Sequence, residues 1–203
     1  MSQLKLSDGR NFEYEDNGVK SDQAILFLHG TPGAVKVWSQ WLPEVTDCLA
    51  IAASRAGYGK SDRHKGRTVA DDLADQQALL DHFHIEEFVS IGWSGGGPHS
   101  LNMTRDPRSK GAITLAGVGE WGHADLDFLA DMGPENEEEF GEALKGEVAI
   151  QAWMSKNAPS LKTITGPDLI SALGGLIGEA DKAALTPVRA EDAAKSFRHA
   201  LVD

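Results

Sequence analysis

The stretch Gly92-Trp93-Ser94-Gly95-Gly96 decides the fold of this 203-residue chain. It matches the pattern G-x-S-x-G, follows the apolar run 88–91, and precedes a segment whose Pro98 suits the first turn of a helix. A sharp turn from a strand into a helix lifts one side chain out of the sheet, and flanking glycines tolerate the strained backbone of such a turn. The pattern therefore predicts that Ser94 lies exposed at the end of a buried strand.

A serine at such a turn is suited to act as a nucleophile. Its hydroxyl is weak unless it is exposed and held near a base. The helix that follows supplies free N–H groups and the positive end of its dipole to a developing oxyanion. The alternative is a plain glycine-rich turn in which Ser94 only caps the helix, and the strand-to-helix context favours the nucleophile.

The chain alternates between strands and helices as far as Val118. We expect strands at 3–6, 12–15, 24–28, 48–53, 88–91 and 111–118, and helices at 37–42, 68–83 and from the serine turn to about 105. The residues from Thr68 to Asp71 resemble a capping box, and Val69 falls on the apolar face of its helix. Continuous apolar strands such as 24–28 are typical of a parallel sheet that is buried on both faces. The alternation predicts an α/β fold with a doubly wound, mostly parallel sheet.

The pattern changes after Val118. From Asp125 onward it indicates amphipathic helices at 137–144, 147–156, 168–173, 179–185 and 190–201, and no strand. We therefore expect an α/β core at residues 1–120 and a helical cap at residues 121–203.

Composition narrows the classes of function. The net charge of −12 and the lack of a basic stretch argue against a nucleic acid or an anionic membrane surface as partner. Cys48 is the only cysteine, and no apolar run approaches the roughly 20 residues of a membrane-spanning helix. His82 and His84 have no arrangement of Cys or carboxylate ligands around them, and a dinucleotide fingerprint fails at Ser100. We expect a cytoplasmic protein that uses neither a metal nor a cofactor.

Two further loops accompany the serine turn. His29-Gly30-Thr31-Pro32-Gly33 follows one buried strand, and the loop 55–62, Arg-Ala-Gly-Tyr-Gly-Lys-Ser-Asp, follows the next. In this order and spacing, the three motifs resemble those of the α/β-hydrolase superfamily. The chain looks most like the esterase, proline-iminopeptidase and epoxide-hydrolase-like members with a helical cap, and the resemblance covers residues 1 to about 118.

The resemblance implies a chemistry. Ser94 would form an acyl-enzyme with a small ester or amide substrate, and the backbone N–H groups of Thr31 and Gly95 would form the oxyanion hole. Epoxide hydrolysis and dehalogenation are disfavoured, because the families known for them carry an aspartate at the elbow. His29 in such loops is usually structural rather than a base.

Other residues are weaker candidates for the site. His29, Trp93, His99 and Trp121 could line a pocket, although His99 could instead pack its helix against the sheet, and Trp121 could pack cap on core. Glu120 lies just past a strand at whose end some members of the superfamily carry their catalytic acid. A solvated surface charge explains Glu120 equally well.

The partners of the serine are not evident from the sequence. In this superfamily the acid and then the histidine follow the serine along the chain. The histidines after Ser94 are His99, His123 and His199, and none follows a predicted strand. We therefore expect the chain to end within or just after the cap, without the last core strands, the acid and the base.

Two functional hypotheses follow. A hydrolase that ends there would be inactive, or would depend on a complementing C-terminal fragment or a homo-oligomer to become active. The alternative is a non-catalytic, truncated chain of this fold, which either binds a small apolar ligand between core and cap or is a remnant without function.

Overall fold

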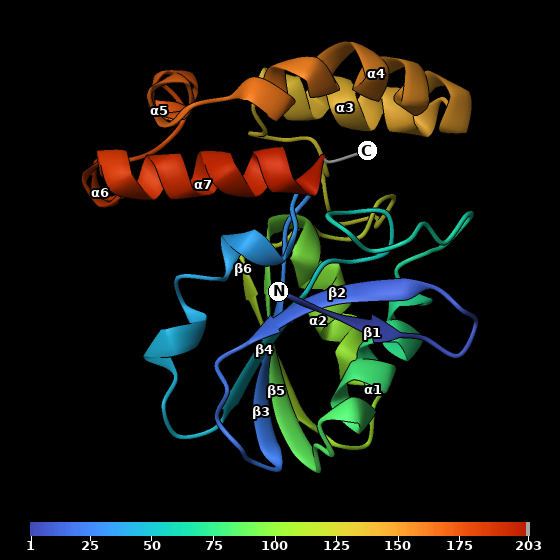
Figure 1. Cartoon of the computed structure of the whole chain (residues 1–203). Coiled ribbons are helices and arrows are strands. Elements are labelled where there is room, and N and C mark those ends of the chain that lie inside the picture. The colour runs from blue at the N-terminus through green and yellow to red at the C-terminus, as the bar shows by residue number, and fades with distance from the viewer. Residues whose placement is uncertain (202–203) are drawn as a thin grey trace. The chain divides into compact units, whose positions relative to one another are not determined.

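The computed structural model describes residues 1–201, which form two compact units (Figure 1). The first unit consists of residues 1–118 together with the end of the chain from His199. The second unit consists of Gly119–Arg198. The division falls just after the last strand of the sheet.

The first unit is built on a six-stranded sheet with the strand order β1-β2-β4-β3-β5-β6. The strands are β1 (Ser2–Lys5), β2 (Asn11–Asp16), β3 (Gln23–Leu28), β4 (Leu49–Ala53), β5 (Glu87–Trp93) and β6 (Ser109–Leu115). Strands β4, β3, β5 and β6 run parallel to one another, and β2 pairs antiparallel with both β4 and the edge strand β1. This arrangement confirms the predicted α/β fold with a mostly parallel sheet.

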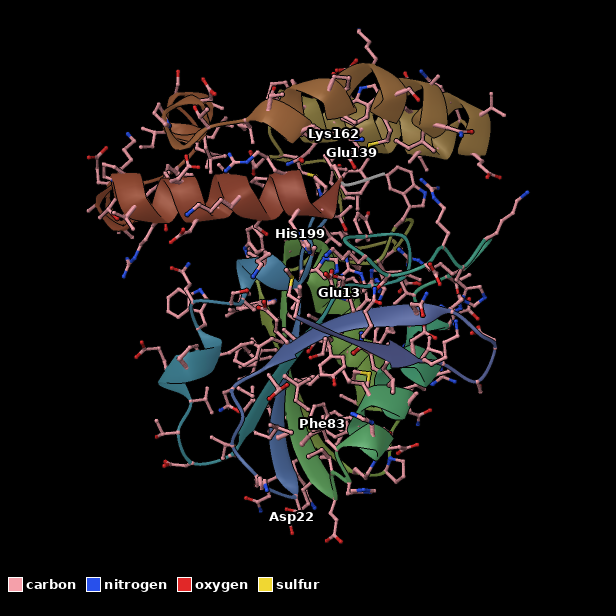
Figure 2. All side chains as sticks on the ribbon, in the orientation of Figure 1. Glu13, Asp22, Phe83, Glu139, Lys162 and His199 are labelled. Carbon is pink, nitrogen blue, oxygen red and sulfur yellow. The ribbon has the colours of Figure 1, made fainter. Side chains whose placement is uncertain are left out.

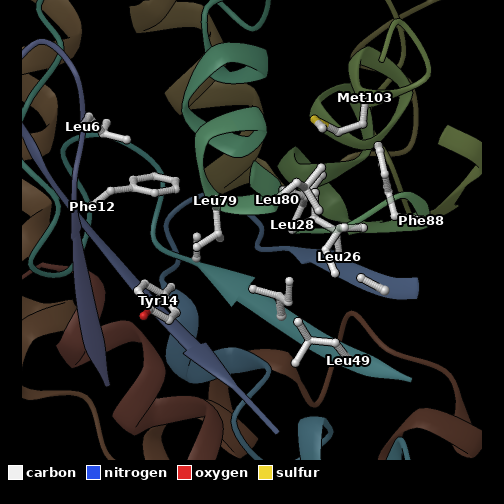
Figure 3. Close-up of a cluster of buried hydrophobic side chains, with 14 residues drawn as sticks. Leu6, Phe12, Tyr14, Leu26, Leu28, Leu49, Leu79, Leu80, Phe88 and Met103 are labelled. Atoms are coloured by element: carbon white, nitrogen blue, oxygen red, sulfur yellow. The ribbon is translucent and has the colours of Figure 1, made fainter. Parts of the chain in front are cut away.

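Each face of the sheet carries its own apolar cluster. On one face, α1 (Asp72–His82) contributes Leu79 and Leu80 and α2 (Gly97–Met103) contributes Met103 to a cluster that is shown in Figure 3. On the other face, Phe27 packs against Trp38, with a ring-centroid distance of 4.9 Å. The central strands β3 and β4 are therefore buried on both sides, as their continuous apolar sequences require.

Two sequence predictions about helices are wrong in detail. The expected helix at 37–42 is replaced by two 3₁₀ turns, η1 (Val35–Val37) and η2 (Leu42–Glu44). So short a segment cannot sustain an α-helix, and Pro43 disfavours helical geometry at the residue before it. Helix α1 begins only at Asp72, because Thr68 donates its backbone N–H and hydroxyl to Asp71 in a separate turn, which leaves Val69 exposed.

The second unit begins with a loop at residues 119–133, and the regular elements described after it are all helices. Its helices are α3 (Pro134–Leu144), α4 (Glu147–Thr163), α5 (Gly166–Leu173), α6 (Glu179–Ala184) and α7 (Pro187–Ala200), the last of which ends among residues counted with the first unit. A capping box between Thr165 and Asp168 starts α5. As the sequence predicted, no strand is described after β6.

Strand β6 is an open edge of the sheet as described. It pairs with β5 on one side, and it ends where Ala116 takes a left-handed φ of 46°. Its Ile113 and Leu115 stand in register with Ile91 and Trp93, yet they are 47% and 46% exposed. Lys110 near its start is the one charged residue of β6, and Gly111–Leu115 carries none. An edge strand whose uncharged part exposes apolar side chains can recruit another strand.

We expect the isolated 203-residue chain to self-associate through β6. Ile113→Lys with Leu115→Lys should shift the species toward monomer, because charged side chains discourage edge pairing. Trp41→Lys is the matched control, since Trp41 is 47% exposed beside η2, which packs on β4. Sedimentation velocity at micromolar concentration measures the outcome. A wild-type chain that is monomeric and melts cooperatively would contradict the expectation.

A buried ion pair joins the end of α2 to β6. Asp106 is buried, and its carboxylate accepts hydrogen bonds from Arg108 Nη2 at 2.8 Å and Gln77 Nε2 at 3.0 Å. These bonds, with that from Arg108 foremost, hold the pKa of Asp106 at about 2 in spite of its burial. Arg108 also contacts the exposed Asp81 at 2.6 Å.

Because the pKa of Asp106 is lower in the folded than in the unfolded chain, it stabilises the fold above about pH 4, and this stabilisation is lost as the pH falls toward 2. Asp106→Asn should lower the melting temperature by several degrees at about pH 7, and by less at about pH 3. Asp81→Asn should change it little, because exposed ion pairs contribute little. Calorimetry of the three proteins at both pH values measures this. An equal effect of Asp106→Asn at both would contradict it.

Candidate active site

Ser94 lies at the junction of β5 and α2. The strand ends at Trp93, residues Ser94–Gly96 form the 3₁₀ turn η3, and α2 begins at Gly97. Ser94 is only half-buried, and its φ is 53°, in the left-handed region that most side chains avoid. Such a conformation costs on the order of 1–3 kcal/mol and persists only where the surroundings impose it.

Glycines impose this turn through close backbone contacts. A methyl group at Gly92 would overlap the carbonyl of Gly96, and one at Gly96 would overlap the carbonyl of Leu28. The turn therefore closes on itself and packs directly on the end of β3. Larger residues at either position would force the two backbones apart.

The loop after β3 lies against the serine turn. A Cβ added at Gly30 would be 3.1 Å from Ser94 Cβ, and one added at Gly95 would be 3.3 Å from the backbone nitrogen of Thr31. The structure thus brings together Thr31, Gly95 and Ser94, which the sequence placed in one site. The arrangement can present two backbone N–H groups beside one hydroxyl.

His29 is fully buried in this loop. Its Nδ1 donates to the carbonyl oxygen of Gly30 at 2.7 Å, because its Nε2 accepts the backbone N–H of Arg55 at 2.9 Å. Burial, and then the charge of Arg55, hold the pKa of His29 well below its usual range. His29 is therefore neutral and fastens the loop; it does not line a pocket, and neither ring nitrogen is free to act as a base.

His99 is also committed to a structural contact. Its Nδ1 lies 2.8 Å from Asp72 Oδ2, and both side chains are buried between α2 and α1. Burial lowers the pKa of His99, although the hydrogen bond to Asp72 partly offsets it. The pair ties the two helices together, which is the packing alternative that the sequence left open.

The remaining pocket candidates lie in different places. Trp93 is half-buried, and a Cβ at Gly30 would be 3.2 Å from its ring. Trp121 and Glu120 are exposed and belong to the second unit, where Trp121 stacks edge-on against Phe128 at a centroid distance of 5.2 Å. Of these three residues, Trp93 is the one that lies beside Ser94 within the first unit.

Sequence reasoning missed a buried carboxylate–histidine pair. His199 Nε2 lies 2.9 Å from Glu13 Oε2, and both residues belong to the first unit (Figure 2). Glu13 also accepts bonds from Ser54 Oγ at 2.7 Å and the N–H of Lys60 at 3.0 Å. Burial would raise the pKa of Glu13, but these bonds, that from His199 first, lower it. The sequence offered no signal for the pair, because the alternation of Phe12, Glu13 and Tyr14 along β2 predicts that Glu13 faces water, whereas the structure buries all three.

Two pockets in the described residues do not have Ser94 in their linings. Asp8, Arg10 and Asp75 help to line one, of about 420 Å³. Asp22 and Phe83, which Figure 2 labels, help to line the other, of about 500 Å³. Within residues 1–201, no group of three or more His, Cys, Asp and Glu side chains gathers to hold a metal ion. No helix in that range is long and apolar enough to cross a membrane.

Comparison with known sequences places this geometry in context. A family model described as alpha/beta hydrolase fold matches residues 23–145, more than half of the chain. A proline iminopeptidase of Arabidopsis thaliana is 27% identical over 149 residues, which cover 68% of this chain and 39% of that protein. A probable proline iminopeptidase of Leptolyngbya boryana is 29% identical over 122 residues, which cover 57% of this chain and 37% of that protein. The chain therefore spans less than half the length of these relatives.

Solved structures share the fold at low identity. A hydrolase from Pseudomonas aeruginosa has a TM-score of 0.58 at 20% identity, over 98% of this chain and 72% of that one. The epoxide hydrolase CorEH has a TM-score of 0.65 at 18% identity, over 98% and 73%. An esterase from Exiguobacterium antarcticum has a TM-score of 0.53 at 15% identity, over 97% and 73%. At such identities the likeness shows the fold alone.

Gly95→Ala tests the contact between the two loops. The new Cβ would lie 2.6 Å from Thr31 Oγ1, so Thr31 must move, and we expect the reaction of Ser94 with a fluorophosphonate to slow by about 10-fold or more. Adding Thr31→Ala removes the shortest contact and leaves the Cβ–Cβ distance of 3.1 Å, so it should restore part of the rate. Gly141→Ala, at a site with open space around it, is the control. An unchanged labelling rate in folded Gly95→Ala would contradict the contact.

Proposed function

Because the chain belongs to the α/β-hydrolase fold family, we propose that it is a hydrolase that cleaves a carboxylic ester or an amide through an acyl-enzyme on Ser94. The observation that carries the proposal is the left-handed backbone of Ser94 at the end of β5, beside the backbone nitrogen of Thr31. A strained turn of this kind presents a serine hydroxyl in front of the sheet rather than burying it.

In the proposed first step, Ser94 Oγ attacks the carbonyl carbon of the substrate and gives its proton to a base. The substrate oxygen takes up the negative charge, and the N–H groups of Thr31 and Gly95 donate to it. The base returns the proton to the departing alcohol or amine as the bond to it breaks. A water molecule then repeats the sequence on the acyl-serine and releases the acid.

The proposed reaction also needs a base and an acid that orients it. His29 and His99 are unsuitable, since the hydrogen bonds described above commit their rings. We propose that a histidine outside these two completes the site, from a longer form of the chain, a complementing fragment or a second copy. Glu120 is retained as a candidate acid because it shortly follows β6.

The proposed substrate is a small ester or amide. The curated relatives are proline iminopeptidases, which makes amides of an N-terminal proline one class to test. The neighbours of known fold include an epoxide hydrolase and a haloalkane dehalogenase, but a serine at position 94 favours acyl transfer over those reactions. The second candidate function is a non-catalytic binder of a small ligand. It is favoured because the rings of His29 and His99 are held in structural hydrogen bonds and cannot serve as the base.

Covalent labelling distinguishes the two candidates. We expect a fluorophosphonate to label the protein, and Ser94→Ala to abolish both this labelling and the turnover of p-nitrophenyl acetate and a proline p-nitroanilide. Loss of the nucleophile should cost on the order of 10⁴-fold or more. Ser109→Ala, away from the turn, is the matched control. The test uses the form of the protein in which the histidine is supplied, and equal turnover by that form and its Ser94→Ala variant would reject the acyl-enzyme.

A further inference from the structure

We propose that Arg55 is a positioning residue, which sets the direction of the Thr31 N–H by holding the carbonyl oxygens of the loop that precedes it. This inference rests on the proposed function, because it assigns a task to Arg55 in the oxyanion hole of that reaction. It concerns a residue that touches neither Ser94 nor a substrate.

Three consecutive residues accept hydrogen bonds from the guanidinium of Arg55. Its Nη1 donates to the carbonyl oxygen of His29, and its Nη2 donates to the carbonyl oxygen of Gly30 at 3.0 Å and to Thr31 Oγ1 at 3.2 Å. Arg55 is 1% exposed, so these bonds are not shared with bulk water. The planar guanidinium holds its donors in a fixed fork, which a flexible ammonium cannot reproduce.

The covalent geometry of the peptide links these bonds to the oxyanion hole. The Gly30 carbonyl and the Thr31 N–H belong to one peptide unit, which is planar and trans, so they point in opposite directions. Arg55 Nη2 and His29 Nδ1 both hold that carbonyl oxygen. The Thr31 N–H is thereby aimed away from Arg55, and Thr31 nitrogen lies beside Gly95, next to the serine.

Burying a cation is costly, which argues for a task beyond packing. A buried guanidinium loses its hydration, and Arg55 Nε has no hydrogen-bond partner within the described residues. Burial lowers the pKa of Arg55 to about 10, so it remains a cation at neutral pH. A fixed positive charge behind the peptide that binds an oxyanion favours the negative charge that develops in the transition state.

Kinetics of Arg55 variants test the proposal in the form of the protein that labels with fluorophosphonate. Arg55→Met should lower kcat by about 10- to 100-fold with KM within about twofold, because the lost interaction acts only in the transition state. Arg55→Lys keeps the positive charge but loses the planar fork of donors, so its kcat should lie between those of Arg55→Met and the wild type. A trifluoromethyl ketone, whose oxyanion occupies the hole, should lose affinity in parallel with kcat.

Arg67→Met is the matched control. Arg67 Nε donates to the carbonyl oxygen of Ala56 at 3.1 Å, so it anchors the loop next to Arg55 without touching residues 29–31. It should lower the melting temperature and leave kcat unchanged. If Arg55→Met does not fold, Arg55→Lys carries the kinetic comparison.

Two outcomes would overturn the inference: folded Arg55 variants with the wild-type kcat, or equal losses of kcat in Arg55→Lys and Arg67→Met. A crystal structure of Arg55→Lys provides a readout that needs no activity. The proposal expects the Gly30–Thr31 peptide to rotate, and an unmoved peptide would reject it. Failure of the wild type to label would reject the proposed acyl-enzyme, while the peptide orientation would still decide the role of Arg55.

Discussion

The site depends on a contact in which backbone meets backbone. Gly96 touches the carbonyls of Leu28 and His29, and Gly92 touches Gly96, with no room for a side chain at either glycine. This contact joins the end of β3 to the turn after β5, and it forces Ser94 into its left-handed conformation. Without it, the loop after β3 would not lie beside the serine, and the hydrogen bonds of that loop would have nothing to position.

Around this contact, hydrogen bonds between buried polar groups hold the loops in place, whereas apolar packing holds the strands and helices together elsewhere in the sheet. The apolar clusters fill both faces of the strands, whereas buried polar residues gather at their carboxyl ends. Arg55, His29 and Glu13 are all buried there, and each is held by backbone or side-chain bonds across the loops. A buried network of this kind has few satisfactory arrangements, so it specifies loop geometry more sharply than hydrophobic burial could.

The sequence predicted those parts of the molecule that are encoded locally. The serine turn and the alternation of apolar strands and helices are short patterns, and the strands lie within a few residues of their expected places. The contacts of Arg55 with the loop after β3 span 24 to 26 residues, and the pair of Glu13 with His199 spans 186. No local periodicity signals such pairings. The expected helix at 37–42 was wrong because its apolar pattern suits a helix, whereas Pro43 disfavours α-helical geometry at Leu42.

The parallel pairing of β3 with β5 has a consequence for how the chain folds. The strands meet in register from Gln23 with Glu87 to Leu28 with Gly92, across a sequence separation of 64 residues. Closing so long a loop costs entropy before any contact is gained, and β4 must also dock on β3. The serine turn can therefore acquire its strained geometry only after the central strands have assembled. A slow step that forms the sheet would precede, and set the rate of, the appearance of a reactive serine.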